Sequence, residues 1–377
     1  MGITAALLLG LLPLSNTLAA ASPLASAATA APLDEMSAQL VADIDRQLTD
    51  EAAKGFGGAV IIKRGDSVVL AKGYGYANRE AKIRFTPETI AQIASVTKSQ
   101  TAAVIATLIA ERKISLGDRV SKFVPAAPEP GRSRTITQLL THSSGLADTC
   151  TGDFERQSEA MLVRACLSKP LAFPVGEDNY SNLGYSVLAL IIQRVTGKSW
   201  ESAVRERVWR PLHMNNIDVL FRGRTQTSFA RGYEGNRARP LLSQSIKALR
   251  GDDWALRGNG SFMASSTTMI QFLDGLLDRR SAFPEAARRM MLQPVVGQGG
   301  KTQEGFGLVF RYDDQGKLVR VGHSGSDGAF YNYLGWLPGN DVRFYFVGNN
   351  GADDAQRALG MALRGALRLP ASAANRT

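Results

Sequence analysis

Residues that commonly bind metal ions are scarce in this sequence. Among its 377 residues there are only two cysteines, Cys150 and Cys166, and three histidines. They are spread along the chain, and none of them forms a Cys-x-x-Cys or His-x-x-x-His spacing. The sequence therefore predicts no bound metal, and no motif in it predicts a cofactor.

Charged side chains are missing from the beginning of the chain. Residues 1–31 contain none, an apolar run extends over residues 5–14, and small residues follow at small-x-small spacing. This pattern is typical of a secretory signal peptide cleaved between residues 20 and 31, although the usual Lys or Arg near its start is missing. Because the run is too short to span a bilayer, we expect a periplasmic or secreted protein with no membrane span after signal removal. A disordered Ala-rich tail is the alternative.

The shortage of cysteine limits intramolecular crosslinks to one. In an exported protein, two thiols separated by a short segment are expected to pair, so we predict a disulfide between Cys150 and Cys166. Two independent buried thiols are the alternative.

Acidic residues are outnumbered, since 34 Asp and Glu face 44 Lys and Arg and the formal charge is +10. The basic residues are scattered, and their densest stretch contains Arg222, Arg224, Arg231, Arg237 and Arg239. Such a stretch suits either an anionic cell-wall polymer such as peptidoglycan or a solvated basic loop, and the loop is the simpler interpretation. No nucleic-acid-binding motif accompanies the charge, so we do not expect nucleic acid as a partner.

The order of strand-like and helix-like patterns predicts an α+β fold. Alternating apolar residues predict a hairpin over residues 58–74 and further strands over residues 306–347. Helical spacing predicts a helix over residues 97–111 and a mainly helical lobe over about residues 135–292. We therefore expect one antiparallel sheet built from both ends of the chain and flanked by helices, in a domain of residues 36–370. A cleft between the sheet and the inserted lobe is the natural place for a site.

The sharpest local motif is Ser95-Val96-Thr97-Lys98, at the predicted start of a helix. Positions three apart share one helix face, so the Ser95 hydroxyl meets the Lys98 amine across one turn. A serine becomes a nucleophile only when a base takes its proton, and a lysine in a dry cleft has its charged form disfavoured. The helix N-terminus also directs free amides toward a developing oxyanion. Because a bare Ser-x-x-Lys occurs by chance about once in a chain of this size, neighbouring motifs decide its meaning.

A second motif, Tyr180-Ser181-Asn182, leads into the next predicted helix. A tyrosine beside a lysine can act as a phenolate or pass a proton to the leaving group, and the Asn182 amide can orient both lysine and substrate. The alternative is structural: Tyr180 packs and Asn182 caps the helix.

A third motif, His323-Ser324-Gly325, lies between two predicted strands. Donors on an edge strand can bind an extended substrate, and Gly325 lets that substrate approach closely. His323 can donate a proton or meet a carboxylate, and a half-buried surface histidine is the alternative. A Ser-His-Asp triad through His142 or His213 is not favoured, because the sequence has no Gly-x-Ser-x-Gly elbow.

Together and in this order, the three motifs resemble those of the serine β-lactamase and penicillin-binding superfamily. The likeness is to the branch with class C β-lactamases, serine D-alanyl-D-alanine carboxypeptidases, and related esterases and aminopeptidases, and it runs from about Met36 to Leu367. Further stretches that resemble this branch are ITQLLTHSSGL at residues 136–146, VTG at 195–197, PLHM at 211–214 and FGL at 306–308.

The resemblance implies a β-lactamase/transpeptidase-like fold and a role for each motif. It implies that Ser95 is the acylated nucleophile and that Lys98 and Tyr180 share the base and acid duties. Asn182 is the implied orienting amide, and His323 is the implied catalytic histidine on the binding strand. The implied substrate-binding strand carries Ser324, Gly325 and Ser326, and the backbone amides of Ser95 and Ser326 would form the oxyanion hole.

Two departures from the family pattern bear on the substrate. Lactamases of this branch usually carry Lys-Thr-Gly where this chain has His323-Ser324-Gly325, which removes a fixed cation for a β-lactam carboxylate. No Glu-x-x-Leu-Asn stretch occurs either, so a deacylating glutamate of the class A kind is not expected.

The predicted function is that of an exported serine hydrolase that cleaves an amide or ester through a Ser95 acyl-enzyme. The signal peptide and the complete Tyr-Ser-Asn motif favour β-lactams or D-alanyl peptides as substrates. A carboxylesterase or D-aminopeptidase of the same fold is the first alternative. A non-catalytic protein that binds the cell wall is the alternative of another class.

Overall fold

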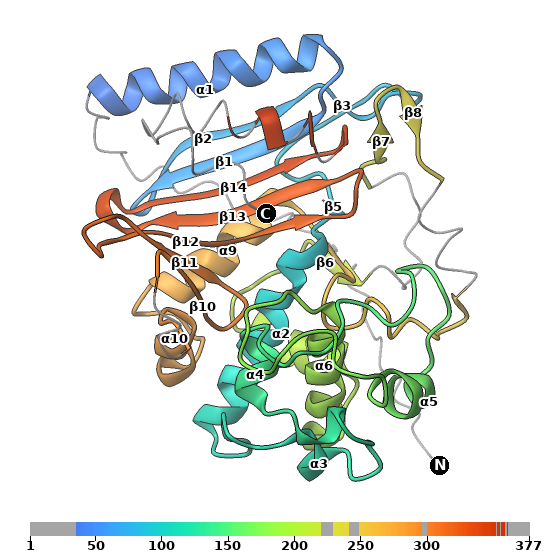
Figure 1. Ribbon diagram of the computed structural model, residues 1–377. Coiled ribbons are helices and arrows are strands. Elements are labelled where there is room, and N and C mark those ends of the chain that lie inside the picture. Colours follow the sequence, from blue (N-terminus) through green and yellow to red (C-terminus); the bar gives the residue numbers. More distant parts are fainter. Residues whose placement is uncertain are drawn as a thin grey trace, which may run out of the picture. The chain divides into compact units, whose positions relative to one another are not determined.

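A seven-stranded antiparallel sheet lies at the centre of the computed structural model (Figure 1). The structure describes residues 35–219, 229–240, 249–295 and 300–351, together with 353, 354, 356–358 and 360. In spatial order the strands are β10 (Thr302–Glu304), β11 (Val309–Tyr312), β12 (Leu318–Ser326), β13 (Tyr331–Leu337), β14 (Val342–Gly348), β1 (Gly58–Arg64) and β2 (Ser67–Tyr74). β14 pairs with β1 along both full strands. The predicted α+β fold, with one sheet built from early and late parts of the chain, is confirmed.

Both faces of this sheet are covered, which explains why β1 reads as an almost continuous apolar run. Successive side chains of a strand point to opposite faces. Val60 and Ile62 of β1 pack in a cluster with the helix α1 (Glu35–Ala53). Ala59 and Ile61 join the larger core on the opposite face. The helix α1 and Ala358 therefore cover one face of the sheet, and the larger core covers the other.

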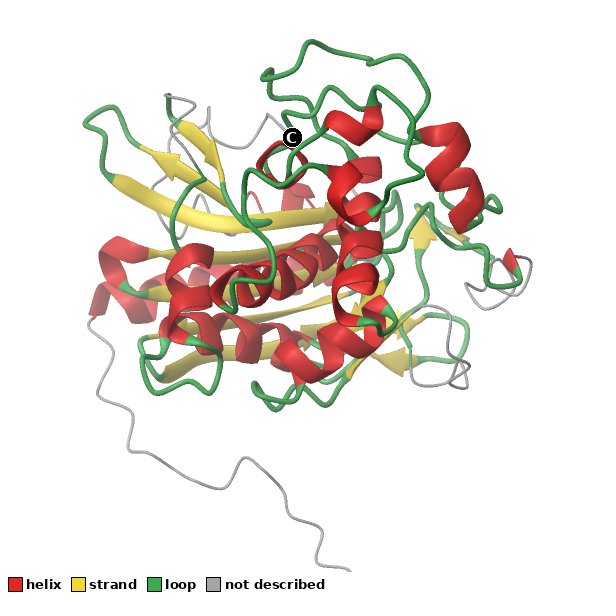
Figure 2. Cartoon of the chain, turned by 90° about the horizontal axis from the view of Figure 1, so that it is seen from below, coloured by secondary structure: helices red, strands yellow, loops and turns green. Residues whose placement is uncertain are grey.

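The helix α2 (Thr97–Ala110) runs through the middle of that larger core. Residues 97–108 are all buried, and the helix contacts α6 (Asn182–Thr196) and α10 (Glu285–Met291). A helix surrounded by protein is apolar on every side, which fits the sequence AAVIATLIA of residues 102–110, whereas the first turns carry buried polar residues. Figure 2, viewed from below, shows the helices of this face lying in front of the strands. The first turn of α2 is therefore held in a fixed position.

Short helices build the region that faces the sheet across α2. They are α3 (Val120–Phe123), α4 (Ile136–Leu140), α5 (Glu159–Met161) and α7 (Trp200–Val204), arranged around α6. The helix α6 ends at Gly197, whose φ of +66° is the left-handed conformation that commonly terminates helices.

The range 135–292, predicted to be a mainly helical lobe, contains other elements as well. Two strands in this range, β6 (Ile217–Val219) and β9 (Phe262–Ala264), form a small sheet with β5 (Ala91–Gln92). Two further pairs of short strands are β3 (Tyr76–Asn78) with β4 (Ile83–Arg84), and β7 (Tyr233–Glu234) with β8 (Arg237–Ala238). The helix α9 (Ser266–Leu277) contacts β1 and β14, so it covers the central sheet. Its amphipathic pattern reveals an apolar face but not which surface that face will cover.

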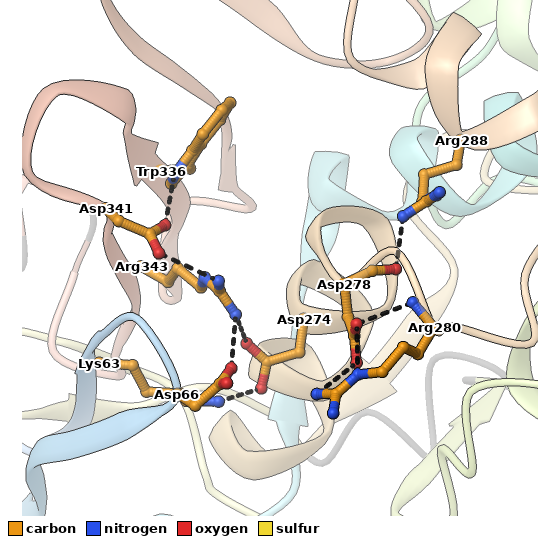
Figure 3. A network of polar contacts seen from close by, with 9 residues as sticks. All are labelled: Lys63, Asp66, Asp274, Asp278, Arg280, Arg288, Trp336, Asp341 and Arg343. Atoms are coloured by element: carbon orange, nitrogen blue, oxygen red, sulfur yellow. Dashed lines mark hydrogen bonds and ion pairs between the residues drawn. The ribbon is translucent and has the colours of Figure 1, made fainter. Parts of the chain in front are cut away.

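A network of charged side chains joins α9 to the central sheet (Figure 3). Arg343 of β14 donates to Asp274 of α9 over 2.8 Å and pairs with Asp341 at 3.3 Å. Lys63 of β1 also pairs with Asp274. The Arg343 side chain is only 8% exposed, and Trp336 donates to Asp341 over 3.1 Å. Three segments that are far apart in sequence thus share one set of ion pairs.

Some predicted features fall outside the residues that the structure describes. These are the signal peptide and two members of the basic stretch, Arg222 and Arg224. Two described members, Arg231 and Arg239, form ion pairs with neighbouring glutamates. Among the described helices, none combines the length and the apolar character needed to cross a membrane.

Candidate active site

Ser95 and Lys98 face each other across the first turn of α2, as their spacing predicts. Ser95 lies in a 3₁₀ turn (Ala94–Val96) that leads directly into the helix. The Lys98 Nζ lies 3.1 Å from the Ser95 Oγ. Ser95 is partly exposed, whereas Lys98 is completely buried. The hydroxyl is thus accessible to a substrate while the amine beside it is shielded from water.

Lys98 is surrounded by neutral acceptors. Its Nζ donates to the Oδ1 of Asn182 over 2.6 Å and to the backbone oxygen of Asn259 over 3.1 Å, besides its contact with Ser95. Burial lowers the pKa of Lys98 to about 7, and the nearby carboxylates of Asp148 and Asp153 oppose this shift. A substantial fraction of the amine is therefore unprotonated near neutral pH and able to accept the Ser95 proton.

Asn182 is itself oriented by a carboxylate. Its Nδ2 and its backbone N–H donate to the Asp148 Oδ1 over 2.9 and 3.1 Å. Because the Nδ2 is committed to Asp148, the Oδ1 is left to accept from Lys98. The cap of α6 is Ser181, whose Oγ accepts from the Gly184 N–H over 3.1 Å. The capping alternative considered for Asn182 is therefore wrong.

Tyr180 extends over the same lysine. The Lys98 Nζ lies 4.7 Å from the centre of the Tyr180 ring, and 42% of the residue is exposed. Partial burial raises the pKa of Tyr180, and the charge of Asp148 adds to this, whereas a hydrogen bond with the Ser95 side chain opposes it. Tyr180 is thus protonated near neutral pH, which suits a proton donor better than the phenolate alternative.

His323 occupies the strand beside the nucleophile as a neutral imidazole. It is 6% exposed, and burial together with the charge of Lys98 lowers its pKa to about 4. Its Nδ1 contacts the backbone oxygen of Ser324, and since a carbonyl only accepts, the ring proton lies on Nδ1. His323 therefore supplies no positive charge for a substrate carboxylate at neutral pH.

The segment from His323 to Ser326 runs along the turn that carries Ser95. β12 is an interior strand of the sheet, but its pairing with β11 ends at Gly322. Residues 323–326 continue to pair with β13 only, so their other edge meets the Ser95 turn. A Cβ on Gly325 would lie 2.4 Å from the Ile93 oxygen and 3.0 Å from the Ser95 nitrogen. Glycine is therefore required for this close approach, and the role of the Ser326 amide in an oxyanion hole stays a prediction.

Four contributors to the site carry no recognisable motif. Asp148, which contacts Asn182, and Asn259, which contacts Lys98, were not predicted, and neither were the nearby Asp153 and Glu304. Burial and the charge of Asp178 raise the pKa of Glu304 to about 8, and Glu304 in turn affects the pKa of Tyr180. Single acidic or amide residues outside a motif give no pattern in one sequence, so only the folded chain reveals them.

The predicted disulfide is present in the structure, and it ties down the segment that carries Asp148. Cys150 is joined to Cys166, with their Cα atoms 5.6 Å apart. Cys166 ends a π-helical turn (Leu162–Cys166) that belongs to the main core. Lys169 adds a bond from its Nζ to the Cys150 oxygen over 3.2 Å. The crosslink thus anchors the loop beside the site to a buried helix turn.

Comparison with known proteins identifies related sequences. A family model described as Beta-lactamase matches residues 41–366. Protein flp of Staphylococcus aureus (strain N315) is 33% identical over 214 residues, covering 53% of this chain and 43% of that protein. The chain thus matches less than half the length of this relative. Penicillin-binding protein 4 of Amycolatopsis lactamdurans is 27% identical over 312 residues, covering 76% of this chain and 78% of that protein.

Two solved structures, one from Pyrococcus abyssi and one from Ochrobactrum anthropi SV3, are similar to this fold. An octameric penicillin-binding protein homologue from Pyrococcus abyssi has a TM-score of 0.70 and 27% identity, covering 86% of this chain and 77% of that one. A D-amino acid amidase from Ochrobactrum anthropi SV3, complexed with L-phenylalanine amide, has a TM-score of 0.68 and 23% identity, covering 87% and 98%. At 23% identity, the likeness to the amidase shows a similar fold only.

Proposed function

Because the chain belongs to the beta-lactamase family and is one of its serine hydrolases, we propose that it cleaves an amide or ester through an acyl-enzyme on Ser95. We also propose that this reaction takes place outside the cytoplasm. β-Lactams or D-alanyl peptides are the proposed substrates. The observation that carries the catalytic part is the buried Lys98 amine, 3.1 Å from the Ser95 hydroxyl, with its pKa lowered to about 7. A nucleophile beside a base of this pKa needs no other activating group.

Acylation follows from this arrangement. Neutral Lys98 takes the proton of the Ser95 hydroxyl while the Oγ forms a bond with the substrate carbonyl carbon. Backbone amides at the start of α2 and at Ser326 are the proposed donors to the oxyanion. As the carbonyl carbon–nitrogen bond breaks, Tyr180 gives its proton to the leaving amine, and the Lys98 ammonium then reprotonates Tyr180. The net result is the transfer of one proton from Ser95 to the leaving amine, with Lys98 neutral and Tyr180 protonated again.

Deacylation reverses the same proton transfers. A water attacks the acyl carbon and its proton passes to neutral Lys98. The bond to the Ser95 Oγ then breaks as that oxygen regains a proton from the Lys98 ammonium. The acid product then leaves. No additional base is needed in this scheme, which agrees with the lack of a class A type glutamate motif in the sequence.

The charges around the site favour one second candidate, an amidase or aminopeptidase whose substrate carries a free amine. His323 is neutral near pH 7 because its pKa is lowered to about 4. The carboxylates of Asp148 and Asp153 act on Lys98 as nearby negative charges. Acidic groups attract a substrate ammonium and repel a substrate carboxylate. A carboxylesterase is the further alternative within the family.

Mass spectrometry of the mature protein tests these proposals. The protein is incubated separately with a penicillin, with D-alanine p-nitroanilide and with a fluorophosphonate, and Ser95→Ala serves as the control. A persistent penicillin adduct on Ser95 indicates a penicillin-binding peptidase, and hydrolysed drug with a transient adduct indicates a β-lactamase. Release of nitroaniline without penicillin reaction supports the amine-bearing substrate, and fluorophosphonate labelling alone supports the esterase. If no reagent modifies Ser95, the acyl-enzyme proposal is wrong and a non-catalytic cell-wall-binding role replaces it.

A further inference from the structure

His142 is a buried histidine that the mechanism above does not use. It lies just after α4 and is only 2% exposed. Its backbone φ is +54°, a left-handed conformation that is costly for a residue with a side chain. Such strain persists only where the surrounding structure holds it in place. Contacts with neighbouring residues therefore hold His142 in this conformation.

Three contacts of His142 surround Tyr180. Its backbone oxygen accepts from the N–H of Asn179 over 2.9 Å, on one side of Tyr180 in the chain. Its Nδ1 accepts from the N–H of Ser181 over 3.1 Å, on the other side. Its ring stacks on the Tyr180 ring with centroids 4.4 Å apart and an interplanar angle of 30°. One residue thus holds the backbone before and after Tyr180, and the side chain between them.

This geometry requires a neutral imidazole with its proton on Nε2. A backbone N–H only donates, so the Nδ1 facing Ser181 has to carry a free lone pair. Burial and the charge of Lys98 lower the pKa of His142 well below its ordinary value, which keeps the ring neutral. The Nε2 is buried and has no hydrogen-bond partner in the described part of the chain. That group is costly to bury, so packing alone does not account for a histidine here.

We propose that His142 is a positioning residue that fixes the ring and hydroxyl of Tyr180 over Lys98 and Ser95 for proton transfer. The proposal rests on the acid role of Tyr180 given under the proposed function. Tyr180 needs such support because 42% of it is exposed, leaving one side free of protein contacts. Its position on the other side is set by His142, and the Lys98 Nζ lies 4.7 Å from the ring centre thus placed.

Two substitutions separate the contacts of His142. His142→Phe keeps an aromatic ring to stack on Tyr180 but has no acceptor for the Ser181 N–H. His142→Asn loses the ring but places an Oδ1 close to the position of the Nδ1, and asparagine tolerates a left-handed φ better than most residues. The asparagine variant is therefore expected to recover part of what phenylalanine loses.

His213 provides a matched control. It has the same φ of +54° and is exposed, and it follows the π-helical turn Arg205–Trp209. His213→Phe therefore imposes the same backbone strain on a β-unbranched aromatic residue without touching Tyr180. Any effect of His142→Phe that comes from strain alone should appear in this variant as well.

The experiment measures kcat and KM for whichever amide the mature protein turns over, penicillin or D-alanine p-nitroanilide, together with thermal unfolding of each variant. An amide is used because its leaving nitrogen has to be protonated, which is the step assigned to Tyr180. We expect His142→Phe to lower kcat on the order of 100-fold, the effect of a small misplacement of a reacting group, with little change in KM. His142→Asn should recover much of that loss, and His213→Phe should keep the kcat of the unchanged protein.

Tyr180→Phe and Ser95→Ala, measured alongside, distinguish two kinds of failure. If both are inactive and folded His142→Phe retains full kcat, the positioning role of His142 is wrong while the proposed function stands. If His142→Phe does not fold, an asparagine variant with normal unfolding and kcat no better than Tyr180→Phe overturns the role of the Nδ1 acceptor. If Tyr180→Phe is fully active, the acid role assigned to Tyr180 is wrong and the proposal on His142 falls with it.

Discussion

Lys98 is a buried residue whose hydrogen bonds are satisfied and whose amine can still lose its charge near neutral pH. Its partners are a hydroxyl, an amide oxygen and a backbone carbonyl, so its hydrogen bonds are satisfied without a directly bonded carboxylate to hold its charge. Asp148 and Asp153 act on it only as nearby charges. This combination makes the neutral amine accessible near pH 7, as a proton acceptor for Ser95 requires.

The pH dependence of Ser95 labelling tests this property. Below its pKa of about 7, Lys98 is mostly an ammonium and has no lone pair for the Ser95 proton. We therefore expect the rate of fluorophosphonate labelling to rise as the pH increases through about 7, measured by mass spectrometry on either side of that value. Lys98→Arg, which stays protonated, should label slowly throughout. A flat profile for the unchanged protein contradicts a base at this position.

Asp148 is expected to support catalysis through Asn182. Asp148→Ala removes the acceptor for two donors of Asn182, so we expect kcat for p-nitrophenyl acetate to fall about 10-fold because the amide loses its orientation. Asp153→Ala is the matched control, since it removes an acidic charge that acts on Lys98 without that contact. Both variants should move the rise in labelling to lower pH, because both charges raise the pKa of Lys98. Equal kcat values in the two variants would show that orientation of Asn182 is unimportant.

At the scale of elements, the site combines residues from three separate parts of the chain. The start of α2 supplies Ser95 and Lys98, the loop before α6 supplies Tyr180, and the far end of β12 supplies His323. The helix is rigid because its surroundings are packed on all sides. The loop that carries Asp148 has no such core of its own, and the disulfide compensates for this.

Loss of the disulfide is expected to reduce stability and activity together. Cys150 and Cys166 are 16 residues apart, and closing a loop of that length stabilises a protein by roughly 3 kcal/mol in the chain-entropy model. We expect the double variant Cys150→Ser, Cys166→Ser to unfold at a lower urea concentration and to have a lower kcat. Adding a reductant to the unchanged protein should reproduce both effects, and adding it to the double variant should change nothing. Identical unfolding midpoints for the two proteins would disprove a crosslink.

At the scale of the whole molecule, the ion pairs of Figure 3 connect early, middle and late segments. β1 and β14 pair along their full lengths, and α9 is held on them by Lys63, Asp274 and Arg343. The same sheet extends to the end of β12 that meets the Ser95 turn. The position of the substrate-binding strand thus depends on closure of the sheet by distant parts of the chain.

Arg343→Met is expected to destabilise the protein by roughly 2 kcal/mol, the usual range for a lost hydrogen bond to a charged group. The cost is limited because Lys63 continues to neutralise Asp274. Arg280→Met is the control in the same figure: its side chain is 82% exposed, and we expect little change in its unfolding midpoint. Urea unfolding of both variants provides the measurement. If the two midpoints shift equally, the network contributes no more than a surface pair.

Much of the fold and site could be predicted because their signals are local. The strands of the central sheet, the helix that begins after Ser95, and the Ser-x-x-Lys spacing each depend on neighbouring residues, and the structure has them where they were expected. The position of α9 could not be predicted, because an apolar face does not specify its partner. Asp148, Asn259 and the role proposed for His142 were not predicted either, because each contact joins residues far apart in the chain.

The sequence by itself determined the family, the α+β class and the residues proposed for catalysis, since these follow from short motifs and from the order of strands and helices. Tertiary structure alone decided that Lys98 is buried among neutral acceptors, that His323 is uncharged, and that the carboxylates of Asp148 and Asp153 lie near Lys98. The physical reason is that charge states and substrate preference depend on burial and on long-range neighbours. Those are properties of the packed chain, and no local pattern of residues contains them.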